Sequence, residues 1–219
     1  MFCMKRLILY DLDGTLVDTL EDLTVAANHM LRMLQAPPVS SQEVGRAVGR
    51  GVHELVRSCL KSDDPKRLAY GVDVFRAYYA RHLLDRSQLY PGAQEALEHF
   101  KDRHQAVITN KPEPFSREIL ERLGVAGYFV EVIGGDANVP KKPDPAAVLA
   151  LMQRHGVVPA ETLLIGDSPI DVETGRNAGV MVVGVAHGLT DEPALAAARP
   201  DALVKNFQAL LERAQQEGW

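Results

Sequence analysis

Cysteine is scarce in this sequence, and so is tryptophan, with two copies and one copy respectively. Cys3 and Cys59 are isolated from each other and form no CxxC motif, which is typical of proteins in a reducing compartment. Long apolar runs are missing as well, because none approaches the roughly 20 residues that a membrane-spanning helix needs. No signal peptide precedes Lys5-Arg6. We therefore expect a cytoplasmic protein with no membrane partner.

An excess of positive charge is also lacking, since the formal net charge is −5. Most of such a surface would repel the phosphate backbone of a nucleic acid, so we expect no nucleic-acid partner. The sequence instead has 46% hydrophobic and 24% charged residues, a balance that allows a buried core and argues against disorder. Its 219 residues suffice for one large α/β domain or for a core with a smaller domain.

The hydrophobic pattern alternates between strands and helices over most of the chain. Helices are expected over residues 93–101, 114–123, 145–155, 170–178 and 206–216, and strands over 7–10, 106–109, 130–134, 162–165, 180–185 and 202–204. This alternation predicts an α/β fold in which a doubly wound parallel sheet, Rossmann-like, carries helices on both faces.

The segment 17–86 has a different pattern, which reads as helical throughout. Helices are expected over 19–35 and 41–48, from near Val52, and over 65–86. This segment follows the first strand and precedes the second, so it is inserted into the α/β fold. We predict a small all-helical cap domain at 17–86, with residues 1–16 and 87–219 forming the α/β catalytic core.

Two carboxylates follow the first strand, in the motif Asp11-Leu12-Asp13-Gly14-Thr15. If the strand geometry persists for two more residues, Asp11 and Asp13 project to the same side. Repulsion between them then favours a shared proton or a hard divalent cation, and Gly14 permits a sharp turn out of the strand. The alternative is a solvated turn, since Asp and Gly are common turn residues.

Three other expected strands also end in polar residues. Ligands of doubly wound sheets bind beyond the carboxyl ends of the strands, so these ends are best considered together. The motifs are Thr109-Asn110-Lys111, Lys141-Lys142-Pro143-Asp144-Pro145 and Gly166-Asp167-Ser168-Pro169-Ile170-Asp171.

The motifs occur in a set order along nearly the whole chain: Asp-x-Asp-Gly-Thr, Thr-Asn, Lys-Pro and Gly-Asp-x-x-x-Asp. This order resembles the haloacid dehalogenase superfamily of phosphotransferases. The longer stretches 11–18, 108–112, 134–136 and 141–145 are similar to those of phosphoglycolate phosphatases. The resemblance implies an enzyme, a phosphoric monoester hydrolase that acts on a small phosphorylated metabolite. The motifs alone leave the organic part of that substrate open.

The resemblance implies that Asp11 is the nucleophile, which forms an aspartyl-phosphate that water then hydrolyses. Asp13 is implied as the acid for the leaving alcohol and the base for that water. Asp11, the backbone carbonyl of Asp13 and Asp167 are the implied Mg²⁺ ligands, and an all-oxygen set favours Mg²⁺ over Zn²⁺. Asp171, about one helical turn beyond Asp167, is expected to accept from metal-bound water or to pair with a lysine.

Groups that bind the phosphoryl oxygens are implied at two strand ends. The Thr109 hydroxyl and the Asn110 backbone N–H are expected to donate to these oxygens, although a Thr-Asn pair is also a common turn. Lys142 matches the family lysine that compensates the charge on the nucleophile and the phosphate. Lys111 is either a surface charge or an accessory contact.

The loop Gly49-Arg50-Gly51 is the part of the cap that we expect to face the substrate. Arg50 can bind a substrate carboxylate with its forked guanidinium, with Gly51 beside it, which suits phosphoglycolate. Alternatively, Arg50 is an exposed cation at a helix end. Ser168 either caps the helix that follows it, the interpretation that we favour, or contacts metal-bound water.

Other functions stay open from the sequence. A sugar-phosphate phosphatase or a phosphomutase retains every core residue named above, whereas a dehalogenase lacks the second aspartate of the first motif. A non-enzymatic phosphate-sensing or interaction protein does not need a nucleophile, an acid, a lysine and metal carboxylates together. The sequence is compatible with a monomer or a homodimer.

Overall fold

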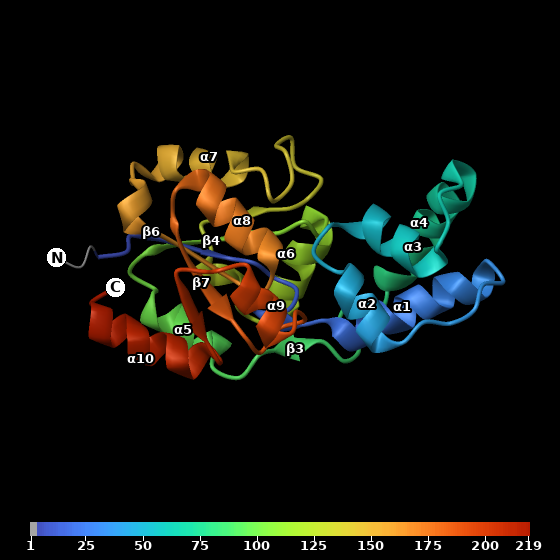
Figure 1. Cartoon of the computed structure of the whole chain (residues 1–219), viewed down its shortest axis with the longest axis horizontal. Coiled ribbons are helices and arrows are strands. Elements are labelled where there is room, and N and C mark those ends of the chain that lie inside the picture. The colour runs from blue at the N-terminus through green and yellow to red at the C-terminus, as the bar shows by residue number, and fades with distance from the viewer. Residues whose placement is uncertain (1–3) are drawn as a thin grey trace.

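The computed structural model describes residues 4–219, so Cys3 lies outside the described residues. A six-stranded parallel sheet, in the order β5-β4-β1-β6-β7-β8, forms its centre (Figure 1). Its strands are β1 (Leu7–Tyr10), β4 (His104–Ile108), β5 (Glu131–Ile133), β6 (Thr162–Gly166), β7 (Met181–Val185) and β8 (Ala202–Val204). The predicted doubly wound parallel sheet is confirmed.

Side-chain alternation along β1 explains why helices cover both faces of the sheet. Ile8 and Tyr10 belong to one buried cluster with residues of α5, α6 and α10, whereas Leu7 and Leu9 belong to a second with residues of α7, α8 and α9. The helices are α5 (Ala93–His99), α6 (Glu113–Arg122), α7 (Ala146–His155), α8 (Pro169–Ala178), α9 (Glu192–Ala197) and α10 (Phe207–Glu217). Two 3₁₀ turns, Ala126–Tyr128 and Pro159–Glu161, lie in the connections.

Four helices form a bundle to one side of the sheet, at the right of Figure 1. They are α1 (Leu20–Met33), α2 (Ser41–Ala47), α3 (Val52–Leu60) and α4 (Pro65–Tyr79). α1 contacts the other three and buries Leu23, Ala27 and Met30, which lie three or four residues apart and so share one face of the helix. The Cys59 thiol is buried in α3 and forms no disulfide. This bundle is the helical cap expected from the sequence.

Two short strands connect the bundle to the sheet. β2 (Val17–Asp18) pairs antiparallel with β3 (Gln88–Leu89), so the expectation that residues 17–86 are wholly helical is wrong at its start. It is also wrong at its end, because α4 stops at Tyr79. The division of the chain into two domains at these positions stays a prediction.

The Asp22 carboxylate links the two connections. Asp22 is buried in the first turn of α1 and accepts from the N–H groups of Arg86 and Ser87, and from the Ser87 hydroxyl at 2.6 Å. The start of the bundle is thereby tied to the chain that returns to the sheet. Within residues 4–219, no helix combines the length and the hydrophobicity that crossing a membrane requires.

Candidate active site

The first motif leaves β1 at the carboxyl edge of the sheet, where the N–H of Asp11 still donates to β6 at 3.0 Å. The chain then turns instead of continuing as a strand. Gly14 has a φ of 86°, and a Cβ atom at this position would collide with the Asp167 carboxylate. Strand alternation therefore does not position Asp11 and Asp13, yet both line the same cavity.

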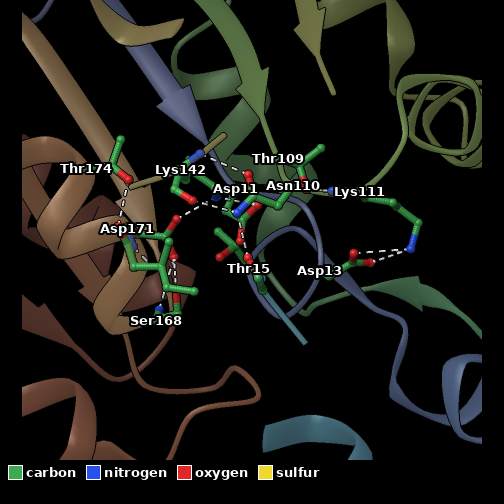
Figure 2. Close-up of polar contacts among 12 residues, drawn as sticks. Asp11, Asp13, Thr15, Thr109, Asn110, Lys111, Lys142, Ser168, Asp171 and Thr174 are labelled. Carbon is green, nitrogen blue, oxygen red and sulfur yellow. Dashed lines mark hydrogen bonds and ion pairs between the residues drawn. The ribbon is translucent and has the colours of Figure 1, made fainter. Parts of the chain in front are cut away.

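Lys142 lies between two buried aspartates. Its Nζ is 2.8 Å from Asp11 Oδ1 and 2.6 Å from Asp171 Oδ1, and the three side chains are almost fully buried (Figure 2). Burial lowers the pKa of Lys142, but Asp11 and Asp171 outweigh this effect and hold the pKa above its usual value. Lys142 is therefore a charged ammonium that partly neutralises both carboxylates.

Three buried aspartates form a cluster. Asp11, Asp167 and Asp171 each offer an oxygen, and these oxygens lie within 4.8 Å of one another. Thr15 Oγ1 and the N–H of Leu189 each donate to Asp167 at 2.8 Å. Burial, together with repulsion from Asp171, raises the pKa of Asp167 to about 8. The same two effects raise the pKa of Asp11 to about 6, although Lys142 opposes them there. Lys142 therefore compensates only part of the negative charge of the three carboxylates.

The cluster has the chemistry of a site for a hard divalent cation. It offers only carboxylate oxygens, and no histidine or cysteine of the described chain joins it. Asp11 Oδ1 contacts the Lys142 ammonium without a hydrogen bond of standard geometry, which leaves a buried oxygen for a cation. The structure brings the expected ligands Asp11 and Asp167 together with Asp171. Ligation by the backbone carbonyl of Asp13 stays a prediction.

Asp13 has its own buried lysine, apart from the Asp11 group in Figure 2. Asp13 Oδ1 accepts from Thr19 Oγ1 at 2.7 Å and from Lys111 Nζ at 2.8 Å. Lys111 also donates to the Tyr79 hydroxyl at 2.8 Å, and its Nζ lies 4.6 Å from the centre of the Tyr79 ring. Of the two alternatives for Lys111, the structure therefore favours the accessory contact over the surface charge.

The Asn110 side chain connects the core to the cap. Its Nδ2 donates to the carbonyls of Lys142 at 2.9 Å and Gly49 at 2.8 Å, and its Oδ1 accepts from the N–H of Lys142 at 3.0 Å. Thr109 is buried next to it, and its Oγ1 accepts from the N–H of Lys111 at 3.2 Å. The sequence predicted a role only for the Asn110 backbone N–H. It did not predict the pair of hydrogen bonds between the Asn110 side chain and the Lys142 backbone, here called the Asn110 clamp.

The cavity lies between the sheet edge and the helical bundle. It is lined by Thr109, Asn110, Lys111, Pro112 and Phe115 of the core, besides the two aspartates of the first motif, and by Leu23, Val48, Gly49, Gly51, Val52, Leu55, Phe75 and Tyr79 of the bundle. Gly51 is thus placed as expected. Arg50 is exposed and lines a neighbouring cavity instead, together with Ser168 and His187.

Ser168 and His187 support the loops around the site. Ser168 accepts from the N–H of Asp171 in a reciprocal capping box at the start of α8, the interpretation favoured from the sequence. His187 Nε2 donates to the Thr15 carbonyl at 3.0 Å, while its ring lies against Tyr90 and Phe207. Burial lowers the pKa of His187. His187 thus contacts the backbone of the first motif, and no local sequence pattern predicts this contact.

The family model of haloacid dehalogenase-like hydrolases matches residues 8–185. The chain belongs to this family. The resemblance seen in the motif order is therefore confirmed, and with it the expectation of an enzyme of the hydrolase class.

Individual relatives extend this similarity over the whole chain. A phosphoglycolate phosphatase of Vibrio parahaemolyticus is 40% identical over 94% of this chain and 95% of its own length. A phosphoglycolate phosphatase of Pseudomonas putida is 37% identical over 95% of this chain and 79% of its own. The crystal structure of a protein from Haemophilus somnus, described as a predicted phosphoglycolate phosphatase, superposes with a TM-score of 0.92 at 31% identity, covering 98% of this chain and 100% of that one.

Proposed function

We propose that this chain is a phosphatase that hydrolyses a small phosphate monoester through an aspartyl-phosphate on Asp11, with Mg²⁺ as cofactor and phosphoglycolate as substrate. The carrying observation is the buried Asp11 carboxylate at the wall of a cavity, with the Lys142 ammonium 2.8 Å away. A carboxylate kept anionic by an adjacent cation is a competent nucleophile. The relatives named phosphoglycolate phosphatase support the choice of substrate.

In the first proposed step, a carboxylate oxygen of Asp11 attacks phosphorus, and the bond from phosphorus to the ester oxygen breaks. The leaving alcohol takes its proton from the Asp13 carboxyl. In the second step, water attacks the aspartyl-phosphate, Asp13 takes a proton from that water, and inorganic phosphate leaves Asp11 free again. Thr109 and Asn110 line the same cavity, which supports their assignment as donors to the phosphoryl oxygens.

Mg²⁺ held by Asp11 and Asp167 would supply positive charge that offsets the repulsion between the nucleophile and the phosphate. Lys142 contributes to the same end through its contacts with Asp11 and Asp171. Asn110 positions this lysine indirectly, because its side chain forms hydrogen bonds with both the N–H and the carbonyl of Lys142.

The proposal is tested by trapping the intermediate. Wild-type protein mixed with Mg²⁺ and ³²P-labelled phosphoglycolate, then quenched in acid, should carry a base-labile phosphate and release inorganic phosphate when left unquenched. Asp11→Asn should do neither, because an amide is not an anionic nucleophile, while its circular dichroism and melting temperature stay close to wild type. Asp102→Asn, at an exposed aspartate, is the matched control. Labelled Asp11→Asn, or wild type that never becomes labelled, would refute the assignment.

A further inference from the structure

We propose that Lys111, oriented by Tyr79, binds a second anionic group of the substrate, a carboxylate one carbon away from the phosphate ester oxygen. Lys111 then selects acidic phosphate esters over neutral ones. This inference rests on the proposed phosphatase function and assigns the specificity to a residue of the core. The sequence pointed instead to Arg50 of the cap.

The charge distribution of the cavity supports this assignment. Among the cavity residues in the described part of the chain, Lys111 is the one cation. Opposite the polar strand ends, the cap contributes apolar side chains, among them Val48, Leu55 and Phe75. A cation among apolar walls attracts an anion more strongly than an exposed cation does, because little water screens the pair. Arg50 is exposed and lines the neighbouring cavity.

The position of Lys111 suits a carboxylate close to the ester oxygen. Its Nζ is 2.8 Å from Asp13 Oδ1 and 3.2 Å from Asp13 Oδ2. Under the proposed mechanism Asp13 contacts the leaving oxygen, so a group attached to that oxygen through a single carbon comes within reach of Lys111. In phosphoglycolate this group is the carboxylate.

The contacts with Asp13 and Tyr79 fix the position of the Lys111 ammonium and still allow it to bind a substrate carboxylate. The Tyr79 hydroxyl and ring contact Nζ from the cap side at 2.8 Å and 4.6 Å. Asp13 also accepts from Thr19 at 2.7 Å, so it keeps a partner when Lys111 donates to a substrate. An ammonium has three N–H donors, and the substrate carboxylate can share them with Asp13 and Tyr79.

The test compares two substrates of similar size, one with the second negative charge and one without it: phosphoglycolate and 2-hydroxyethyl phosphate. The ratio of their kcat/KM values isolates recognition of the carboxylate, because loss of the Asp13 contact slows both reactions alike. Lys111→Met should reduce this ratio roughly 10- to 100-fold, the effect of losing one charged hydrogen bond. Lys111→Arg should restore part of it, and Tyr79→Phe should reduce it less than Lys111→Met does. Lys101→Met, at an exposed lysine, controls for the loss of one positive charge.

Each outcome decides between the alternatives. An unchanged ratio in a folded Lys111→Met protein overturns the inference and leaves Lys111 as a structural partner of Asp13. A ratio that falls with Arg50→Met and not with Lys111→Met also overturns it and assigns the carboxylate to Arg50. Wild type without any preference for phosphoglycolate contradicts the proposed substrate itself, which separates the two failures. If Lys111→Met does not fold, the ratios of Lys111→Arg and Tyr79→Phe decide, because both variants keep a cation at position 111: a lowered ratio supports the inference, and an unchanged ratio in both overturns it.

Discussion

At the residue scale, each aspartate of the first motif has a buried lysine of its own. Lys142 contacts Asp11 and Lys111 contacts Asp13, each at 2.8 Å. A buried charge is costly unless a partner of opposite sign accompanies it, and each of these lysines has such a partner. The two pairs lie apart in Figure 2.

The separate position of Asp13 leads to a kinetic prediction. With p-nitrophenyl phosphate, Asp13→Asn should still form the aspartyl-phosphate, because p-nitrophenolate leaves without needing a proton. Hydrolysis of the intermediate should slow by roughly 10²- to 10⁴-fold, because the base for the attacking water is gone. Rapid-quench measurements should therefore show a burst of p-nitrophenolate followed by a slow steady rate. Equal slowing of both phases would contradict the role assigned to Asp13.

The sequence predicted the proximity of those polar residues that lie at strand ends or in the loops that follow them. The carboxyl ends of parallel strands share one edge of the sheet, so Asp11, Asp167 and Lys142 had to lie close together once the strands were recognised. The contact of Tyr79 with Lys111 depends instead on how α4 packs against the sheet edge, which no local pattern encodes. The Asn110 clamp was missed for the same reason, since Lys142 is distant from Asn110 in the chain.

At the element scale, the buried strands and most helices were predicted to within two residues, because continuous apolar runs and apolar stripes mark them strongly. The hairpin of β2 and β3 was missed, since two-residue strands show no period. The end of α4 was placed too late because residues 80–86 contain neither glycine nor proline, while the structure turns there through hydrogen bonds of Arg81 and His82 to the last turn of the helix.

The prediction at this scale concerns Asp22, whose hydrogen bonds link the two connections between cap and core. Asp22→Ala removes a buried acceptor and leaves the N–H groups of Arg86 and Ser87 unpaired. We expect the free energy of unfolding to fall by about 1.5–3 kcal/mol, the range for hydrogen bonds to a charged group. Urea unfolding followed by circular dichroism measures this loss.

The matched control is Asp73→Ala, at an exposed aspartate of α4, where the change should stay within about 0.5 kcal/mol. Asp22→Asn should lie between the two variants, since the amide oxygen still accepts while the charge is gone. A loss in Asp22→Ala no larger than in the control would mean that the carboxylate does not hold the two connections together.

At the scale of the whole molecule, the fold concentrates negative charge at one edge of the sheet. Three aspartates from the ends of β1 and β6 and from the start of α8 meet there, and Lys142 offsets only part of their charge. Burial and mutual repulsion raise the pKa of Asp11 to about 6 and that of Asp167 to about 8. Protein free of metal therefore binds protons at this cluster that the unfolded chain releases.

This proton uptake fixes how stability depends on pH and on Mg²⁺. A carboxyl with a folded pKa above the unfolded value, about 3.9 for Asp, makes the folded state bind more protons, so the stability of metal-free protein contributed by the cluster falls as pH rises from about 4 to about 8. Mg²⁺ at 100 times its Kd should add about 2.7 kcal/mol, a rise in Tm of roughly 5–10 °C for a chain of this size. The rise should be larger at pH 8 than at pH 5.5, because protons compete with the metal for the same oxygens.

Differential scanning calorimetry with Mg²⁺, and with NaCl at matched ionic strength, measures this effect. Asp167→Asn should abolish most of the Mg²⁺-dependent rise in Tm, because it removes one carboxylate charge while the amide retains the shape of the side chain. The same variant should be more stable than wild type at pH 8 without metal, because the repulsion with Asp11 and Asp171 is relieved. A rise in Tm that survives in Asp167→Asn, or that is the same at both pH values, would mean that Mg²⁺ binds elsewhere on the protein.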